Sequence, residues 1–406
     1  MLYQTLQERG FVAQCTNEEG LSHLLSQPAT LGYIGYDPTA TSLHVGHLLP
    51  IICLIHLQRA GHVPVVLVGG GTGLIGDPSG RTEMRNFLTL DKLQENVDAI
   101  KNQLSRFLDF DRAKMVNNAD WLLKLNYLEF LRDVGRHFSV NRMLAAESVK
   151  NRLERGMNFI EFNYSLLQAY DFMHLAKHYN CRLQLGGNDQ WGNIVAGVDL
   201  ARRMLDVEVY GLTMPLLTTA GGAKMGKTAS GAVWLDAQRT PVYDFYQFWV
   251  NTADEDVIRF LKFFTFLEMS KIDDLARLEG AQLREAKQIL AWEVCALVHG
   301  AASADEARAA AQAAFGGKGG DPNSMPTTIV DSQRLEQGIP AFMLLYESGL
   351  AKSSSEARRL ISQGGAYIGE EKINTFDQLI DLSQLQADGA IWLRAGKKKH
   401  HRIVAG

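Results

Sequence analysis

Apolar residues follow one pattern before about residue 243 and another after it. The runs Leu31–Tyr36 and Val63–Val68 are each followed by a turn or by glycines, and a helix-like stretch over about 45–60 separates them. The run Arg182–Leu185, followed by two glycines, continues the series. Strands that alternate with helices predict βαβ units and a mainly parallel sheet, in which ligands bind at the carboxyl ends of the strands.

Beyond residue 243 the spacing of apolar residues becomes helical. Thr252 and Glu255 have the spacing of a helix capping box, and a second helix is predicted over about 282–299, ending at Gly300. The glycine- and proline-rich stretch 316–326 predicts a linker. We therefore expect an α/β domain over 1–245, an α-helical domain over 246–318, a linker over 319–338 and a small module over 339–406.

Composition narrows the class of protein. The 406 residues are 46% hydrophobic and 21% charged, which excludes a disordered, collagen-like or small disulfide-rich chain. The net charge of −4 argues against nucleic-acid binding by the whole chain, but Arg394–Arg402 is a local basic stretch without an acid. Four widely spaced cysteines predict reduced thiols, and no run is long enough to cross a membrane. We expect a cytoplasmic protein that does not bind membranes.

The segment His44-Val45-Gly46-His47 is the first candidate for binding phosphate. It follows a strand and a turn and starts a helix, and the amino terminus of a helix attracts phosphate. Its two imidazoles, one turn apart, could both donate hydrogen bonds to oxygens there. The alternative is two unrelated surface histidines.

Two glycine motifs are further candidates. Gly71–Gly76 matches GxGxxG, but Asp77 follows at once, which delays the helix and places an acid beside any phosphate. Gly221–Thr228 matches the P-loop pattern, but the strand-like residues 232–235 follow where a P-loop needs a long helix. We therefore interpret Gly221–Thr228 as a mobile loop whose lysines reach phosphate, with a solvated turn as the alternative.

The combination of His44–His47 with Lys224–Thr228 resembles the HIGH and KMSKS signatures of the class I aminoacyl-tRNA synthetases. The intervening sequence resembles the bacterial tyrosyl-tRNA synthetases, and the final module resembles an S4-type RNA-binding domain. This resemblance implies an α/β fold with a Rossmann-like parallel-sheet catalytic domain, an α-helical domain and a small α+β S4-like domain. The stretches that carry it are Tyr33–Thr39, Val68–Ser79, Tyr164–Asp171, Gln184–Asn193 and Ser353–Ile361.

The resemblance also implies a reaction. The chain would activate L-tyrosine with ATP, forming tyrosyl-adenylate and pyrophosphate, and then transfer tyrosine to the terminal ribose of tRNA(Tyr). ATP with Mg²⁺ would be a substrate, no tightly bound organic cofactor is expected, and the sequence shows no carboxylate cage for a metal. A homodimer is implied as well.

Carried over residue by residue, the resemblance assigns three groups of site residues. For phosphate it implies His44, His47, Thr39, Lys224, Lys227, Thr228, Arg81 and Arg85. For tyrosine it implies Tyr33 and Asp171 at the phenol, with Asp77, Tyr164, Gln168 and Gln190 at the ammonium group. For the remainder of ATP it implies Gly35, Asp37, Gly46, Gly187, Asp189 and Lys227, and for tRNA it implies Arg358, Arg359, Lys397, Lys398 and Lys399.

The residues themselves support part of this assignment and qualify another part. Tyr164, Gln168 and Asp171 lie at i, i+4 and i+7, on one face of a predicted helix. Ile34 stands where relatives often have a cysteine that contacts the ribose, and Arg81 where a lysine is common.

The alternatives to a synthetase are a P-loop NTPase that acts on RNA, a nicotinamide-dependent oxidoreductase and a non-catalytic RNA-binding protein. ATP–pyrophosphate exchange with each amino acid would distinguish them.

Overall fold

The structure is a computed structural model. It describes residues 2–79, 89–146, 149–150, 153, 156–222, 225–228, 231–316, 326–369, 371–386, 389–396 and 399–406. The chain forms two compact units. The first contains Met1–Thr240 and Asn251–Val298, and the second contains Pro241–Val250 and His299–Gly406. The division of the chain into four segments remains a prediction, except at the linker.

A six-stranded sheet forms the centre of the first unit. Its order is β1-β6-β5-β2-β3-β4, and every neighbouring pair is parallel except β1 with β6. The chain builds β2, β3 and β4 in one direction and then β5 and β6 on the other side of β2, so the strand order reverses between β2 and β5. The predicted parallel sheet is confirmed. The strands are β1 (Gln14–Cys15), β2 (Leu31–Tyr36), β3 (Val63–Val68), β4 (Lys114–Asn117), β5 (Leu183–Gly187) and β6 (Tyr210–Met214).

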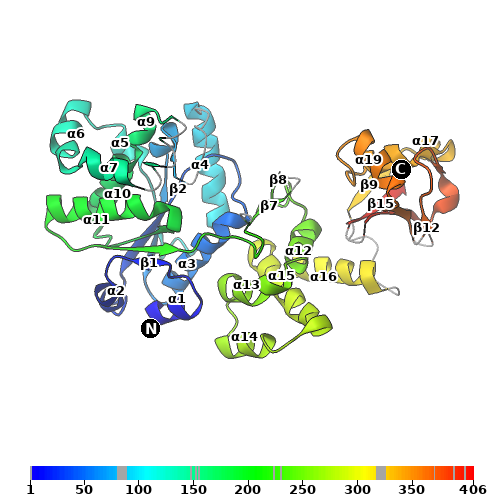
Figure 1. Ribbon diagram of the computed structural model, residues 1–406, viewed down its shortest axis with the longest axis horizontal. Coiled ribbons are helices and arrows are strands. Elements are labelled where there is room, and N and C mark those ends of the chain that lie inside the picture. Colours follow the sequence, from blue (N-terminus) through cyan, green and yellow to red (C-terminus); the bar gives the residue numbers. More distant parts are fainter. Residues whose placement is uncertain are drawn as a thin grey trace. The chain divides into compact units, whose positions relative to one another are not determined.

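Helices cover both faces of this sheet (Figure 1). Tyr33 of β2 packs in a core cluster with Phe172 and Ala201, while a Cβ on the neighbouring Gly32 would contact Leu57. Successive residues of a strand point to opposite faces, so the helices that carry these partners lie on opposite sides. They are α10 (Tyr164–Tyr179) and α11 (Trp191–Leu205) on one face and α3 (Leu48–Arg59) on the other.

Helix α3 is preceded by a 3₁₀ turn over Val45–His47, so the predicted helix over 45–60 is confirmed with a tighter first turn. The other helices of this unit are α1 (Leu2–Glu8), α2 (Glu18–Leu24), α4 (Leu90–Leu104), α5 (Ala119–Leu122), α6 (Tyr127–Asp133), α7 (Val140–Ala145), α9 (Phe159–Phe162), α13 (Val257–Phe264), α14 (Met269–Leu275) and α15 (Leu283–His299).

The start of the chain packs against α13. Phe11 is fully buried and meets Phe263 of α13 edge to face, with ring centroids 5.7 Å apart. The guanidinium of Arg9 donates to the carbonyl oxygens of Lys262 at 3.1 Å and Thr265 at 2.8 Å, which satisfies groups at the carboxyl end of that helix. The capping box predicted for Thr252 and Glu255 is wrong, because a 3₁₀ turn over Asp254–Asp256 precedes α13 and its cap is Ala253, without a side-chain bond.

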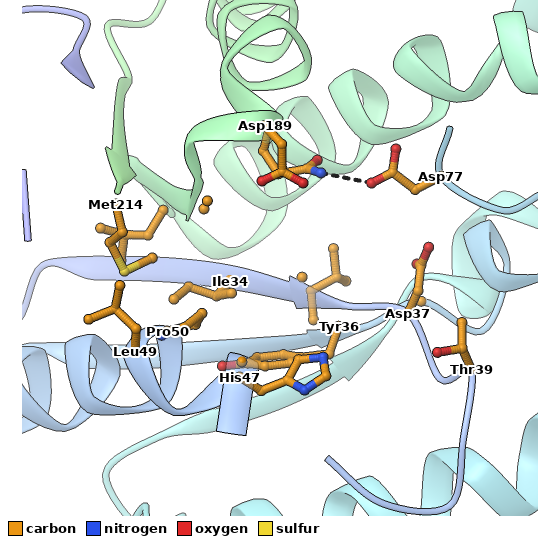
Figure 2. Close-up of a pocket in the computed structure, with 18 of the residues that line it drawn as sticks. Ile34, Tyr36, Asp37, Thr39, His47, Leu49, Pro50, Asp77, Asp189 and Met214 are labelled. Atoms are coloured by element: carbon orange, nitrogen blue, oxygen red, sulfur yellow. Dashed lines mark hydrogen bonds between the residues drawn. The ribbon is translucent and has the colours of Figure 1, made fainter. Parts of the chain in front are cut away.

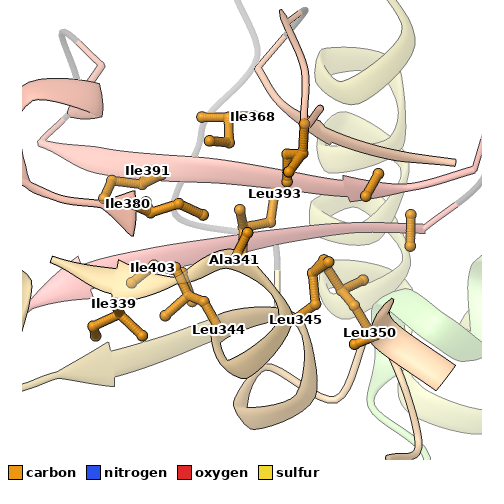
Figure 3. Close-up of a cluster of buried hydrophobic side chains, with 14 of the residues drawn as sticks. Ile339, Ala341, Leu344, Leu345, Leu350, Ile368, Ile380, Ile391, Leu393 and Ile403 are labelled. Carbon is orange, nitrogen blue, oxygen red and sulfur yellow. The ribbon is translucent and has the colours of Figure 1, made fainter. Parts of the chain in front are cut away.

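The second unit joins two helices to a small α+β module. Helices α12 (Val242–Val250) and α16 (Ala301–Gly316) pack on each other. In the module a sheet of order β12-β11-β14-β15-β9 packs on helices around a core that includes Leu344, Leu393 and Ile403 (Figure 3). The elements are β9 (Thr327–Val330), α17 (Ser332–Glu336), β10 (Ile339–Pro340), α18 (Ala341–Glu347), α19 (Ser354–Ser362), β11 (Ala366–Ile368), β12 (Glu371–Lys372), β13 (Leu379–Ile380), β14 (Ala390–Ala395) and β15 (Lys399–Ala405).

The α+β module confirms the predicted fold class but corrects the predicted linker. Residues 327–336, which the sequence assigns to the linker over 319–338, form β9 and α17, and β9 pairs in parallel with the last strand β15. Residues 317–325 lie outside the described part of the chain. Among the helices that are described, none is long and apolar enough to cross a membrane.

Candidate active-site cleft

A cleft of about 670 Å³ opens at the carboxyl ends of β2 and β5, where the strand order reverses. Its volume lies within the range of pockets that hold small molecules. Figure 2 shows Asp77 and Asp189 along one wall and His47 along the other. Every predicted tyrosine, ATP or phosphate residue whose side chain is described lines this cleft: Tyr33, Gly35, Asp37, Thr39, His44, Gly46, His47, Asp77, Tyr164, Gln168, Asp171, Gly187, Asp189 and Gln190.

The structure describes the remaining predicted phosphate residues only in part. Arg81, Arg85 and Lys224 lie outside the described residues, and only the backbone is described for Lys227 and Thr228. Their backbone nevertheless fixes where the second signature segment runs. It forms a short hairpin of β7 (Lys227–Thr228) and β8 (Gly231–Ala232), where a P-loop would have a long helix. The P-loop alternative therefore lacks its structural context.

One end of the cleft presents a carboxyl group and a hydroxyl group. Asp171 on α10 is buried, and its two oxygens accept hydrogen bonds from Asn118 Nδ2 at 2.9 Å and Trp121 Nε1 at 2.7 Å. Burial raises the pKa of Asp171 to about 7, although both hydrogen bonds lower it. The buried hydroxyl of Tyr33 makes no hydrogen bond within the described part of the chain. A buried polar atom without a partner, beside a carboxyl group, fits the hydroxyl of a ligand.

Asn118 and Trp121 are functional candidates that sequence reasoning missed. Asn118 follows β4 directly. Its side-chain Nδ2 donates to Asp171 and to the hydroxyl of Thr72, while its side-chain Oδ1 accepts from the N–H of Gly71 at 2.7 Å. The Trp121 ring stacks on His174 with centroids 4.3 Å apart. Because Asn118 occupies the Gly71 N–H, the GxGxxG segment does not offer that group to a dinucleotide. The only sequence signal is an asparagine pair at the end of a short strand.

A second part of the cleft is acidic and rich in amides. Gln190 Nε2 donates to Asp77 at 2.7 Å, and Asn193 Nδ2 lies 3.1 Å from the side-chain oxygens of both Gln190 and Gln168. Burial, and then the charge of Asp37, raise the pKa of Asp77 to about 6. Two carboxylates and several amide oxygens in a buried pocket favour a cation such as an ammonium group.

Asp37 directly follows β2 and lies close enough to Asp77 for its charge to act on that carboxyl group. Its two oxygens accept hydrogen bonds from Tyr164 at 3.2 Å and from the hydroxyl of Thr72 at 3.0 Å. A Cβ on Gly69 would lie 2.3 Å from the Asp37 carboxylate, so a larger residue there would displace that carboxylate. The predicted one-face arrangement of Tyr164, Gln168 and Asp171 on α10 is confirmed, since all three line the cleft.

The histidine segment is held by its own side chains. His44 Nδ1 accepts from the Gly46 N–H at 3.0 Å, and His47 Nδ1 accepts from the His44 N–H at 3.2 Å. In each neutral ring the proton therefore sits on Nε2, which is a donor. Burial, and then His44, lower the pKa of His47 to about 3. The helix N–H of Gly46 is used by His44, so a phosphate would meet the imidazole Nε2 atoms rather than that amide.

The two signature segments lie side by side. Gly226 has φ +83°, and a Cβ there would lie 3.2 Å from the Gly46 nitrogen. Val45 N–H donates to Val233 at 2.9 Å, and an antiparallel bridge joins His44 to Trp234. The backbone of the downstream segment thus runs along the histidine segment at the edge of one cleft.

In the second unit the predicted tRNA residues lie on the α+β module. Arg358 and Arg359 of α19 are exposed, and the Arg358 guanidinium stacks over the rings of Phe342 and Phe376. Lys397 and Lys398 lie outside the described residues, and only the backbone of Lys399 is described. Arg402, in the same basic stretch, is buried, so it does not belong to an exposed basic surface.

Comparison with known proteins gives consistent matches. Residues 27–316 match the family model for class I tRNA synthetases (W and Y). A tyrosine–tRNA ligase of Desulfatibacillum aliphaticivorans is 54% identical over 99% of this chain and 98% of its own, and one of Clostridium botulinum is 51% identical over 99% of both chains. The crystal structure of a C-terminally truncated Aspergillus nidulans mitochondrial tyrosyl-tRNA synthetase matches with a TM-score of 0.69 and 32% identity, over 77% of this chain and 93% of that one.

Proposed function

Because the chain belongs to the class I tRNA synthetases of the tryptophan and tyrosine family and is a tyrosine–tRNA ligase, we propose a role for the residues that line its cleft. The enzyme activates L-tyrosine with ATP and transfers the tyrosyl group to tRNA. The observation that carries the proposal is the convergence of both signature segments on a cleft that also contains Tyr33 and Asp171.

The tyrosine substrate lies along α10 in this proposal. Its phenol hydroxyl meets Tyr33 and Asp171, whose remaining hydrogen-bonding capacity supports the placement. Its ammonium group lies among the acidic and amide groups at the other end. The residues proposed there are Asp77, Tyr164, Gln168 and Gln190, with Asn193 orienting the two glutamines.

ATP lies across the cleft from α10, with its phosphates between the two signature segments. The Nε2 atoms of His44 and His47 donate to phosphate oxygens, and Lys224 and Lys227 approach from the opposite segment. The reaction is in-line attack of the tyrosine carboxylate on the α-phosphate, so catalysis depends on positioning and charge neutralisation. Mg²⁺ would accompany the phosphates as part of the ATP substrate. The other residues proposed for these contacts are Thr39, Thr228, Arg81 and Arg85.

The adenosine binds between β2 and β5 in the same proposal. Gly35 and Gly187 let the backbone approach the nucleoside, and the Asp189 carboxylate accepts from the ribose hydroxyls. Ile34 lines this part of the cleft and is buried, and its apolar side chain has no donor for the ribose. We therefore propose that the ribose contact made by cysteine in relatives is missing here.

Tyrosine affinity is expected to fall below about pH 6 because Asp77 then becomes protonated. Its raised pKa of about 6 means that the carboxylate form, which pairs with the ammonium group, is lost as the pH falls through that value. We expect kcat/KM for tyrosine in ATP–pyrophosphate exchange to drop about tenfold per pH unit below 6, since one proton is taken up. Asp77→Asn should have a low kcat/KM and lose the part of the acid limb near pH 6, keeping only the part due to Asp171, whose pKa is about 7. An identical acid limb in Asp77→Asn would contradict the assignment.

We propose that tRNA reaches the cleft with help from the α+β module. Arg358 and Arg359 are exposed there, which supports contacts with phosphate. Lys397, Lys398 and Lys399 are proposed as further contacts on sequence grounds. A tRNA substrate and four free cysteines also support a cytoplasmic location.

A homodimer is supported by an exposed apolar surface on the first unit. We define this surface by Leu123, Tyr127, Leu128, Val140 and Phe159, all with more than half of their area exposed. They belong to or adjoin the short helices α5, α6, α7 and α9, which gather at one end of the unit (Figure 1). A concentration of exposed large apolar side chains is typical of a protein interface.

The double variant Leu128→Asp/Val140→Asp is expected to dissociate the dimer. Each lost apolar contact costs about 1.5–3 kcal/mol, so the dissociation constant should rise by about 100-fold or more. Sedimentation velocity over a range of concentrations measures this change. Ile329→Asp in the second unit is a matched control, since Ile329 and Leu128 are both 74% exposed. A double variant that sediments like the parent enzyme at every concentration would argue against this surface.

A further inference from the structure

A buried carboxylate outside the cleft ties α13 to the segment before the second signature. Asp256 is 2% exposed, and its Oδ2 accepts from the Ala220 N–H at 2.8 Å. Its Oδ1 accepts from the guanidinium of Arg259 at 2.5 Å, and the same guanidinium donates to the Thr218 carbonyl oxygen at 2.5 Å. We call Asp256 and Arg259 the anchor pair. It holds the backbone at Thr218 and Ala220, about forty residues away in sequence.

The anchored backbone leads directly into the cleft. Leu217, which precedes Thr218, lines the cleft, and its carbonyl oxygen accepts from the Met225 N–H at 2.9 Å. Met225 also lines the cleft and belongs to the second signature. The anchor pair therefore fixes the backbone that lies between β6 and the second signature segment.

The other end of the signature segment is fixed on the histidine segment. Leu235 N–H donates to Leu43 at 2.9 Å, next to the bond between Val45 and Val233. One end of the segment is thus tied to a helix and the other to the histidine segment. Because Met225 is bonded to Leu217, a shift of the anchored residues 218–220 should also move Met225 in the cleft.

We propose that Asp256 and Arg259 are positioning residues for adenylate formation. They hold residues 218–220 so that the signature segment meets the phosphates of ATP opposite His44 and His47. The inference rests on the proposed role of Lys224 and Lys227. Removing either member of the anchor pair leaves the other buried or half-buried without its charge partner, so the anchored backbone should shift.

Arg259→Ala is the primary test, because the Arg259 side chain is 41% exposed and its loss is compatible with folding. We expect the rate of tyrosyl-adenylate formation to fall about 10- to 100-fold, since small misplacements of reacting groups have effects of that size. KM for ATP should rise while KM for tyrosine stays nearly unchanged. Asp256→Asn should show the same split, and Arg259→Lys should recover part of the rate, because an ammonium group can replace one of the two bonds.

A matched control separates this role from a general contribution to stability. Asp274 and Arg277 on and after α14 form an ion pair with the same i, i+3 spacing, but both side chains are largely exposed. Arg277→Ala should leave both KM values and the rate as they are in the parent enzyme. If Arg259→Ala changes the two KM values equally, or changes neither KM nor rate, the proposal is overturned.

The double variant Arg259→Ala/Lys227→Ala shows whether the anchor pair acts through the signature segment. If it does, Arg259→Ala should have little further effect once Lys227 is lost, because coupled residues are not additive. Full additivity would overturn the proposal. A Lys227→Ala enzyme with unchanged pyrophosphate exchange would instead overturn the proposed role of the segment, and the anchor inference with it. A large loss in Lys227→Ala beside a silent Arg259→Ala would overturn the anchor inference alone.

Discussion

Asp171→Ala is expected to lower the selectivity for tyrosine over phenylalanine by about 10²- to 10⁴-fold. A site built to bond a hydroxyl rejects the analogue without it because its buried polar groups are left unpaired. Tyrosyl-tRNA synthetases are the reference case for that effect, with discrimination of about 10⁵. The measurement is the ratio of kcat/KM for the two amino acids in ATP–pyrophosphate exchange.

Asp171→Asn should lose nearly as much selectivity as the alanine variant. Both carboxylate oxygens accept from donors, Asn118 and Trp121, so the amide nitrogen of asparagine would have to face one of them. Asn118→Ala is the milder comparison, because it keeps the carboxylate and removes one of its two supports. An unchanged ratio in Asp171→Ala, with normal thermal unfolding, would remove Asp171 from the specificity role.

The second large effect is expected at His44. His44→Ala should slow adenylate formation by about 10²- to 10³-fold, which is the typical cost of losing one donor to developing charge. Single-turnover formation of tyrosyl-adenylate measures this rate directly. KM for tyrosine should change little, because the phenol and ammonium ends of the cleft do not contact this segment in our proposal.

His44→Asn distinguishes the phosphate role from the structural one. His44 caps the turn through Nδ1, and asparagine is a good residue for a helix cap, so this variant should keep the cap while losing the Nε2 donor. We expect His44→Asn to be nearly as slow as His44→Ala but closer to the parent enzyme in thermal stability. Recovery of the parent rate in His44→Asn would mean that the cap, not the phosphate contact, is what His44 supplies.

The strands of the fold were predictable where they are buried on both faces. β2 and β3 have the predicted bounds, because a strand covered by helices on both sides is a continuous apolar run. β1 has two residues and β4 is a partly exposed edge strand, so neither carries such a run. The sequence places β9 in the linker, because its partner, β15, lies at the far end of the chain and nothing local marks the pairing.

The candidate site was predictable only in part, for a related reason. The i, i+4, i+7 spacing places Tyr164, Gln168 and Asp171 on one helix face, and that local pattern can be read from the sequence. Asn118 and Trp121 hold Asp171 across about fifty residues, from a different element. Periodicity says nothing about such contacts. The packing of Gly226 against Gly46 is likewise a long-range contact, which the two signatures suggested only through the family resemblance.

The packing of the first residues against α13 limits how the enzyme can be divided. Phe11 and Arg9 find their partners on a helix about 250 residues later, after the chain has passed through the second unit and returned. A fragment that stops at residue 240 would expose that aromatic core to water and invite aggregation. An expression fragment meant to keep the adenylation chemistry should therefore extend through residue 298, beyond the last helix that the amino terminus needs.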